Sequence, residues 1–421
     1  MEKDFGRVEE HLITPVYGEY DIVVVGAGPA GVSAALAAGR AGAKVLIMDR
    51  FNCMGGAWTT GFMNPLFDHR NKDGILRELI NDLSARGQWG GFWDESFHYE
   101  TMKVLLEEKL RDAGVTMLFN TTFSRTLVEE APNEAGRRVV TGVIAENASG
   151  RYAYKAKLVF DCTGDGNAAA DAGCAYEIGV DGDYRECQAM TLMFLVGNIP
   201  PQYRAGMKLK DKLEAVYEKA GREIPFHMPY LIPVPSGQFA VIQFTHMYEY
   251  DPLSAEEVTQ ATIEGRRQMM EAVELLRTYD EEFRDLELIT SSGVLGIRES
   301  RRIVGEYTLT LEDVQSGKQF EDGIADVTFG IDIHPKYNNA QKLMKSRPYQ
   351  IPFRCLIPRG WDGILTAGRC ISGTHEAMAS YRVTGNCSQM GERAGRIAVY
   401  ALRAGVNVRE VDVREALAAP T

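Results

Sequence analysis

The sequence predicts an α/β fold, because strand-like and helix-like segments alternate and glycine-rich turns lie near both ends of the chain. The first turn, residues 26–31, follows an apolar strand at residues 20–25 and precedes an alanine-rich helix. The second, residues 366–369, ends an apolar strand that begins at residue 364. Two such signals at opposite ends indicate one large nucleotide ligand that both chain ends hold.

The first turn matches the Rossmann-type dinucleotide fingerprint. Gly26 makes the tight turn, Gly28 lets the backbone approach a pyrophosphate, and Gly31 lets the helix pack on the strand. Pro29 and Ala30 open that helix, so its free amides and positive dipole end point at the turn. The turn is therefore predicted to hold a dinucleotide.

Asp49 ends the second strand, residues 44–48. A carboxylate at this point accepts hydrogen bonds from ribose hydroxyls and repels a 2′-phosphate. A glycine turn alone is weak evidence, but here the strand, the helix and the acid agree with it.

Composition excludes several functional classes. The chain has 421 residues, enough for two domains or one large one, and a net charge of −12, which works against nucleic-acid binding. Met1–Gly6 shows no leader pattern, and no apolar run is long enough to span a membrane, so we expect no membrane partner and a cytoplasmic location. The seven cysteines form no CxxC pair and are expected to be reduced, and no residue grouping has metal-ligand spacing, so no metal is expected. The oligomeric state stays open.

The rest of the chain shows a regular succession of elements. A polar, glycine-rich stretch covers residues 50–91, and a helix is expected at 99–113, followed by a parallel strand at 115–119. Residues 123–154 have the short strands and turns of a β-meander, and a strand at 158–160 is expected to return to the parallel sheet.

The middle of the chain differs in pattern. It has apolar strands at 190–196 and 240–244 and a long helix after Ser254, where Ser254 and Glu257 have capping-box spacing. It indicates a second domain. A last helix, with an apolar face from Met390 to Ala401, returns to the first domain.

Several stretches together resemble the FAD-dependent oxidoreductases of the glutathione-reductase-like fold, and more closely a large bacterial family of that fold whose members are mostly uncharacterised. They are the fingerprint through Asp49-Arg50, Gly55–Gly61, Asp161–Asn167, Gly296–Tyr307 and Ile364–Gly385. The resemblance implies a Rossmann-type FAD-binding domain with a β-meander insertion, residues 1–172 and 346–421, and an α+β substrate domain, residues 173–345.

The resemblance also assigns cofactor contacts. The helix that opens at residue 384 would face the flavin pyrimidine, where a helix N-terminus favours the negative charge of reduced flavin. Taken singly, each of these stretches is equally well an ordinary turn or close helix packing. The residues placed on FAD are Gly26, Gly28, Pro29, Ala30, Gly31, Asp49, Arg50, Gly55, Gly56, Ala57, Thr60, Phe123 (by its backbone), Thr163, Gly164, Asp165, Gly368, Arg369, Thr384, Gly385 and Asn386.

Three residues are catalytic candidates. The resemblance places His375 and Arg382 along the flavin edge, where an imidazole can act as a general base; equally, each can simply hydrogen-bond the cofactor or backbone. Arg298 can clamp a substrate carboxylate at two points or donate a proton. For Arg301 and Arg302 a structural ion-pair network is favoured.

These observations favour an enzyme that transfers a hydride between FAD and a small molecule. Transient NAD(P)H, oxygen or another carrier would be the redox partner, since no second fingerprint is present. Cys53 has no nearby second cysteine, which disfavours dithiol chemistry. Alternatives are an NAD-dependent dehydrogenase, a non-catalytic escort protein on the same fold, and a flavoprotein that modifies transfer RNA; the acidic charge argues against the last.

Overall fold

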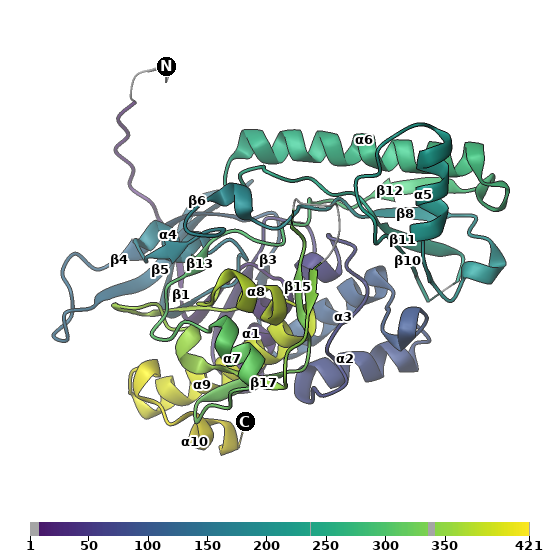
Figure 1. The fold of residues 1–421 in the computed structure, drawn as a ribbon. Helices are drawn as coiled ribbons and strands as arrows, with labels where there is room; N and C mark the ends of the chain where they lie inside the picture. The colour runs from purple at the N-terminus through teal and green to yellow at the C-terminus, as the bar shows by residue number, and fades with distance from the viewer. Residues whose placement is uncertain (1–7, 236, 336–341, 421) are drawn as a thin grey trace.

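The computed structural model describes residues 8–235, 237–335 and 342–420 and shows an α/β fold built around a mixed sheet (Figure 1). Its strands are β1 (Val16–Val25), β2 (Val45–Met48), β3 (Thr116–Leu118), β4 (Thr122–Val128), β5 (Arg138–Asn147), β6 (Gly150–Asp161), β18 (Trp361–Asp362) and β19 (Ile364–Thr366). They lie in the order β18-β5-β6-β1-β2-β3, with β19 beside β6 and β4 beside β5. Because β1, β2, β3, β19 and the end of β6 run parallel, the predicted Rossmann-type core is confirmed.

The first and last long helices pack tightly on each other. In α1 (Pro29–Arg40) nearly every side chain is small and buried, so a neighbouring helix can approach closely. The neighbour is α9 (Thr384–Ala404). A Cβ at Gly391 would lie 2.0 Å from the Ala30 carbonyl oxygen, and one at Gly395 would lie 2.5 Å from that of Ala34. The glycines of α9 are therefore required for this contact.

One strand replaces two predicted ones. The sequence suggested a meander that ends at residue 154 and a separate strand at 158–160, but β6 is continuous from Gly150 to Asp161. Its first half pairs antiparallel with β5, and its second half pairs parallel with β1 and β19. The alternating pattern of the first half and the continuous apolar run of the second half hid this continuity, since one half is partly exposed and the other is buried.

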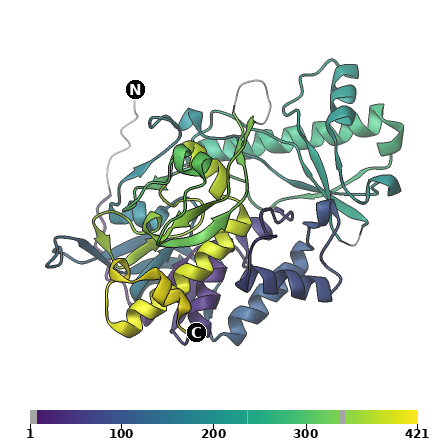
Figure 2. The same cartoon turned by 60° about the horizontal axis from the view of Figure 1, so that its bottom comes forward.

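A five-stranded antiparallel sheet forms the middle of the chain and lies to one side of the parallel sheet (Figure 2). Its order is β12 (Glu287–Ser291), β8 (Phe194–Gly197), β11 (Phe239–Gln243), β10 (Tyr230–Pro233) and β9 (Met207–Lys208). The helices α5 (Lys210–Lys219) and α6 (Ala255–Tyr279) pack on it around a core that contains Phe194, Tyr217 and Met269. This sheet and its helices form the expected α+β part.

The capping box of α6 is only half formed. The Ser254 hydroxyl accepts a hydrogen bond from the Glu257 amide at 3.3 Å, as predicted. The Glu257 carboxylate instead accepts from the Asp251 amide at 2.7 Å, which ties the preceding turn to the helix.

The domain division at residue 345 stays a prediction. Leu309, Val314 and Ile331 belong to the same hydrophobic core as α1, so part of the middle segment packs with the cofactor-binding part. The other strands and the helix between residues 176 and 352 are β7 (Tyr176–Glu177), β13 (Arg302–Ile303), α7 (Leu311–Ser316), β14 (Gly323–Val327), β15 (Ile331–Ile333), β16 (Lys342–Met344) and β17 (Tyr349–Pro352).

The stretch from residue 50 to 91 contains a helix that its polar composition concealed. In α2 (Gly74–Ala85) the apolar side chains recur at helical spacing and are buried, among them Leu76, Leu79 and Leu83. The other helices are α3 (Tyr99–Asp112), α4 (Asn167–Ala172), α8 (His375–Tyr381) and α10 (Val413–Ala418). Among the described residues no helix is both long and apolar enough to cross a bilayer, and Met1–Gly6 lie outside them.

Candidate cofactor and substrate site

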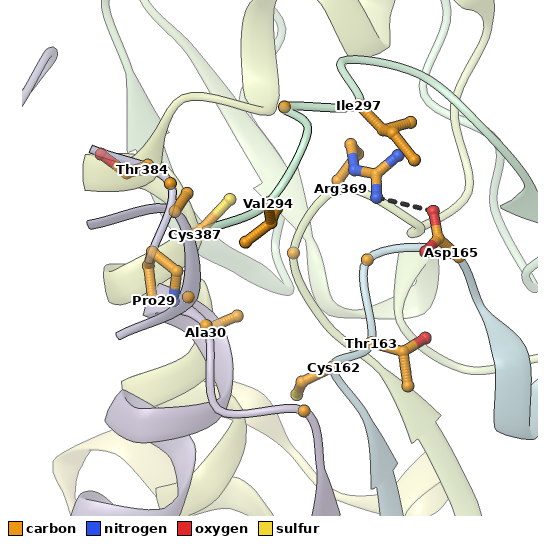
Figure 3. A pocket seen from close by; sticks show the side chains of 18 of the residues that line it. Pro29, Ala30, Cys162, Thr163, Asp165, Val294, Ile297, Arg369, Thr384 and Cys387 are labelled. Atoms are coloured by element: carbon orange, nitrogen blue, oxygen red, sulfur yellow. Dashed lines mark hydrogen bonds and ion pairs between the residues drawn. The ribbon is translucent and has the colours of Figure 1, made fainter. Parts of the chain in front are cut away.

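A cavity of about 370 Å³ lies where the first turn, the C-terminal segment and the middle of the chain meet. In Figure 3, Pro29, Ala30, Thr384 and Cys387 lie on one side of it and Asp165 with Arg369 on the other. The predicted site residues that line it are Gly26, Gly28, Pro29, Ala30, Asp49, Arg50, Gly56, Ala57, Phe123, Thr163, Gly164, Asp165, Arg298, Gly368, Arg369, Arg382 and Thr384. Gly31, Gly55, Thr60, His375, Gly385 and Asn386 are not among the lining residues.

The three fingerprint glycines have different reasons to be glycine. Gly26 has a φ of +94°, and a Cβ there would lie 2.5 Å from the Cys162 carbonyl oxygen. A Cβ at Gly31 would lie 2.0 Å from the Gly26 carbonyl oxygen. Gly28 has an ordinary φ of −69°, and its Cβ would meet nothing within 4 Å. The protein itself therefore needs Gly26 and Gly31, whereas Gly28 keeps open the space that a ligand would fill.

Two helix N-termini open onto this cavity. Gly28 is the N-cap of α1, and Val383 is the N-cap of α9. Within the described part of the chain neither end has a side-chain cap, so the helix itself leaves its first backbone N–H groups without partners. Such ends attract anions. The pair fits a cofactor that carries a pyrophosphate at one place and negative charge at another.

Asp49 lies at the end of β2 and lines the cavity. One carboxylate oxygen accepts from the Ala27 amide at 2.6 Å, and the other accepts from the Phe51 amide at 3.0 Å. Burial raises the pKa of this carboxyl. The two backbone donors orient the carboxylate and leave lone pairs for ribose hydroxyls.

The second glycine turn stacks on the first. The Gly55 amide donates to the Ala27 carbonyl at 2.7 Å, and a Cβ at Gly56 would lie 2.9 Å from the Gly28 Cα. The Thr60 hydroxyl lies 3.3 Å from the Cys53 sulfur, behind the lining residues. Gly55 and Thr60 therefore support the turn, while Gly56 and Ala57 form the surface that a ligand would meet.

Asp165 and Arg369 form an ion pair in the cavity wall (Figure 3). Their atoms lie 2.8 Å apart, and the Ser300 hydroxyl donates to the same carboxylate at 2.7 Å. Burial raises the pKa of Asp165, but the Arg369 charge and the Ser300 hydrogen bond outweigh it and hold the pKa below its usual value. Ser300 was not predicted, although it lies in the Gly296–Tyr307 stretch.

The start of α9 is partly buried. Thr384 lines the cavity, whereas a Cβ at Gly385 would lie 2.5 Å from the Phe67 carbonyl oxygen. Asn386 is completely buried, and neither side-chain polar atom has a hydrogen-bond partner in the described chain. Gly385 thus serves packing, and Asn386 is a buried amide behind the wall.

The catalytic candidates separate into two groups. Arg298 and Arg382 line the cavity. His375 lies behind it, where its Nδ1 is 2.9 Å from the Glu299 carboxylate. Glu299 also accepts hydrogen bonds from Arg302 and from the Gln188 amide. This buried network joins His375 to the ion-paired arginine that the sequence analysis expected to be structural.

The middle of the chain supplies a further wall of the cavity. Thr191, Met193 and Gln243 line it from around β8 and β11, and residues 294–297 line it from the loop before Arg298. The sequence marked only the stretch that begins at Gly296, because Thr191, Met193 and Gln243 reach the cavity through pairing of distant segments and no local pattern marks them.

The cysteines at the cavity are protonated thiols at neutral pH. Burial raises the pKa of Cys387 to about 12 and that of Cys162 well above its usual value, which disfavours the nucleophilic thiolate. The seven thiols are all free. Among the described residues no three metal-binding side chains come together.

The glycine turns, the acid and the paired helix ends around one cavity define a protein that binds a dinucleotide. The sequence model described as FAD dependent oxidoreductase matches residues 21–419. The chain therefore belongs to this family, and it is a flavoenzyme whose cofactor is FAD.

Curated relatives match part of the chain. Thiamine thiazole synthase from Aeropyrum pernix is 49% identical over 117 residues, which are 26% of this chain and 40% of that protein. The enzyme of the same name from Saccharolobus solfataricus is 30% identical over 151 residues, 35% of this chain and 55% of that protein. The chain thus spans about half the length of these relatives.

Solved structures share the fold at low identity. A geranylgeranyl bacteriochlorophyll reductase-like protein from Thermoplasma acidophilum has a TM-score of 0.50 and 12% identity, with 95% of this chain and 82% of that chain covered. A flavoprotein/dehydrogenase from Cytophaga hutchinsonii has a TM-score of 0.51 and 14% identity, with 95% and 83% covered. These similarities support the fold.

Proposed function

We propose that the protein transfers a hydride between bound FAD and a small-molecule substrate. The observation that carries the proposal is one cavity lined both by the fingerprint turn at Gly28 and by the guanidinium groups of Arg298 and Arg382. FAD supplies hydride transfer at its flavin ring, and the protein's task is to bind and orient the reactants. The thiazole synthase relatives match too little of the chain to extend their activity to it.

The backbone would do most of the cofactor binding. The backbone amides of Gly28, Ala30 and Gly31 at the start of α1 would bind the pyrophosphate, since Pro29 has no N–H to donate. The Asp49 carboxylate would accept hydrogen bonds from a ribose. The start of α9 at Thr384 would stabilise negative charge on the flavin pyrimidine. These contacts use the groups that the protein leaves without partners: the uncapped helix ends and the space at Gly28.

The remaining predicted contacts form the flanks of this proposed site. Gly31, Gly55, Thr60, Gly385 and Asn386 would hold the shape of the wall, while lining residues would meet the cofactor. The proposed lining contacts are Gly26, Pro29, Ala30, Arg50, Gly56, Ala57, Phe123, Thr163, Gly164, Asp165, Gly368 and Arg369.

Arg298 and Arg382 are the proposed substrate-facing residues, because both line the cavity. His375 would act through Glu299, to which it is bound, and would position that carboxylate. Replacement of His375 by alanine tests this directly. Unchanged turnover would remove His375 from the catalytic residues.

A nicotinamide would enter only transiently, because the chain has one fingerprint. The purified FAD-loaded protein should be mixed anaerobically with NADH, with NADPH and with candidate small molecules, while the visible flavin absorption is followed. We expect at least one of them to bleach the flavin, with a slower rate when the transferred hydrogen is replaced by deuterium.

Bleaching that proceeds in one-electron steps, or shows no isotope effect under single-turnover conditions, contradicts hydride transfer. A protein that retains no FAD after reconstitution contradicts the cofactor placement. The Arg267→Gln variant, on the exposed face of α6, serves as a surface control. It should retain FAD and show the same flavin bleaching as the wild type.

A further inference from the structure

Arg298 has one side of its guanidinium group bound to the protein and the other side open. Its Nη1 donates to the Ala189 carbonyl at 2.7 Å and to the Thr191 hydroxyl at 2.5 Å. Neither Nε nor Nη2 donates to any described residue, and neither is closed off from solvent. Because Arg298 lines the cavity, this open edge is accessible to a ligand there.

The open edge is held in place. Thr191 and Gly296 exchange two backbone hydrogen bonds, of 3.0 and 2.8 Å, which fix the loop that carries Arg298 against the segment just before β8. The Thr191 hydroxyl and the Ala189 carbonyl then fix the guanidinium plane. A donor fork fixed in this way loses little conformational entropy when it binds a ligand.

In the part of the chain that the structure describes, Arg298 forms no direct ion pair with a carboxylate, unlike Arg302 with Glu299 or Arg369 with Asp165. The nearby Asp332 carboxylate is paired with Arg382 instead. Burial, and then the charge of Arg382, lower the pKa of Arg298 to about 9, although the Asp332 charge acts in the opposite direction, so the group stays cationic at neutral pH. A buried cation beside a cavity favours an anion in that cavity.

Further donors lie close to this position. The Gln188 side chain is 3% exposed and its Nε2 has no partner among the described residues, while its Oε1 accepts from Arg382 at 3.3 Å. Arg382 Nε is likewise buried and without a partner there. Met193 and Leu295 add apolar surface to the same cavity, while His246, His334 and Tyr248 lie near Arg298. One open fork matches the two oxygens of a carboxylate, whereas a doubly charged phosphate needs a second free cation, and Arg382 is already paired with Asp332.

We propose that the substrate is a small carboxylic acid whose carboxylate is bound at two points by Nε and Nη2 of Arg298, with Arg382 beside it. This inference rests on the proposed function, because it names the substrate class of the same cavity. The cofactor's pyrophosphate is a separate anion, placed at the start of α1.

The test uses FAD-loaded protein and matched pairs of acid and amide: acetate and acetamide, succinate and succinamide, benzoate and benzamide. Binding is followed by the change in the visible flavin spectrum at constant ionic strength, with inorganic phosphate as a further arm. We expect at least one acid to bind saturably and its amide to bind at least about tenfold more weakly, as expected for loss of a charge-assisted pair.

Three variants locate the binding. Arg298→Gln should weaken the responding acid by at least about tenfold, and Arg298→Lys should weaken it less, since it keeps the charge without the fork. Arg267→Gln, an exposed arginine of α6, should have no effect. If the Arg298→Gln variant does not retain FAD, the proposal is still tested by the Arg298→Lys variant and by the comparison of acid with amide in the wild type.

Equal binding of acid and amide, tighter binding of phosphate than of every acid, or no spectral response to any acid overturns the proposal. Full acid binding by Arg298→Gln does the same. A protein that holds FAD and accepts a hydride yet ignores all acids would leave the proposed function standing and refute only this inference.

Discussion

The cavity wall at residues 26–30 presents backbone to the ligand, whereas the wall at residues 294–298 presents side chains. On the first wall the proposed contacts are those of a turn and an uncapped helix, and the residues there are mostly small. On the second wall Arg298 is the main polar side chain, and it is fixed to Ala189 and Thr191, just before β8. Under the proposed function, backbone geometry binds a general cofactor, whereas a few side chains select a particular substrate.

The largest effect is expected behind the side-chain wall. Arg302 is 4% exposed and donates to Glu299 and to the carbonyls of Gly179 and Gly373. Arg302→Met leaves the buried Glu299 carboxylate with too few partners and should lower the free energy of unfolding by about 3–5 kcal/mol. Urea denaturation checks this. If adding Glu299→Gln to Arg302→Met restores part of the lost stability, the unpartnered Glu299 carboxylate is the cause of the loss. Wild-type stability in the single Arg302→Met variant would contradict this explanation.

The support of the backbone wall should be nearly as sensitive. Gly31→Ala places a Cβ 2.0 Å from the Gly26 carbonyl oxygen and should cost about 3 kcal/mol of stability in FAD-free protein. Gly28→Ala is the matched control, because its Cβ meets nothing, and it should stay within about 0.5 kcal/mol of the wild type. Similar melting curves for the two variants would contradict the view that the fold requires glycine at residue 31 but not at residue 28.

A larger side chain at Gly28 separates folding from cofactor binding. Gly28→Val should leave the FAD-free fold intact but fill the space at the start of α1, so FAD affinity should fall by at least about 100-fold. Titration of FAD-free protein with FAD, followed by flavin fluorescence, measures the change. Full flavin occupancy in this variant would show that the cofactor does not pass Gly28.

The pH dependence of FAD binding should report Asp49. Burial raises the pKa of Asp49, and ribose hydroxyls donate to the ionised form. FAD affinity should therefore be highest at pH values above the pKa of Asp49 in the folded protein, and it should decline as the pH falls through that pKa. Without FAD, stability should decrease as the pH rises between the ordinary aspartate pKa and the raised one, because the native state holds the proton more tightly. The Asp49→Asn variant should bind FAD about tenfold more weakly than the wild type, and its FAD affinity should depend less on pH. An unchanged pH dependence in this variant would exclude Asp49 as the titrating group.

The smallest effect is expected at a surface pair far from both walls. Arg40 donates twice to Glu78, at 2.7 and 2.8 Å, and Lys109 also pairs with it. Arg40 first, and then Lys109, lower the pKa of Glu78 from 4.5 to about 2. The stabilisation is present above the ordinary glutamate pKa and is lost as the pH falls through the lower value. Glu78→Gln should cost less than about 1 kcal/mol at neutral pH. Denaturation curves at neutral and acid pH measure the free energy of unfolding. A loss larger than about 1 kcal/mol in Glu78→Gln would show that the ion pair at Arg40, on the exposed side of α1, contributes substantially to stability.

The backbone wall could be predicted because its signals are local. The strand, Gly26, Gly28, Gly31 and Asp49 follow one another in the sequence, and each has a steric or electrostatic reason. The sequence could not show which of the predicted residues reach the cavity and which lie behind its lining. Asn386 and Gly31 were expected at the ligand but lie behind the lining residues, because helix packing decides which atoms reach the cavity.

The side-chain wall could be predicted only in part. Arg298 stood out as a charge between apolar residues, but Thr191 and Gln243 reach the cavity through pairing of distant segments. The helix at Gly74–Ala85 was missed for a different reason, since charged residues separate its buried leucines and weaken the pattern. Long-range pairing and diluted periodicity thus set the limit of the prediction.

The close contact between α1 and α9 bears on how the protein is made. Gly391 and Gly395 of α9, against which α1 packs, lie far from Gly28 in the sequence. During synthesis α1 is therefore made long before the helix that covers it, and the packing of α1 on α9 is a late step of folding. We expect the cofactor to be captured only after this step, because Gly28 and Thr384 line the same cavity.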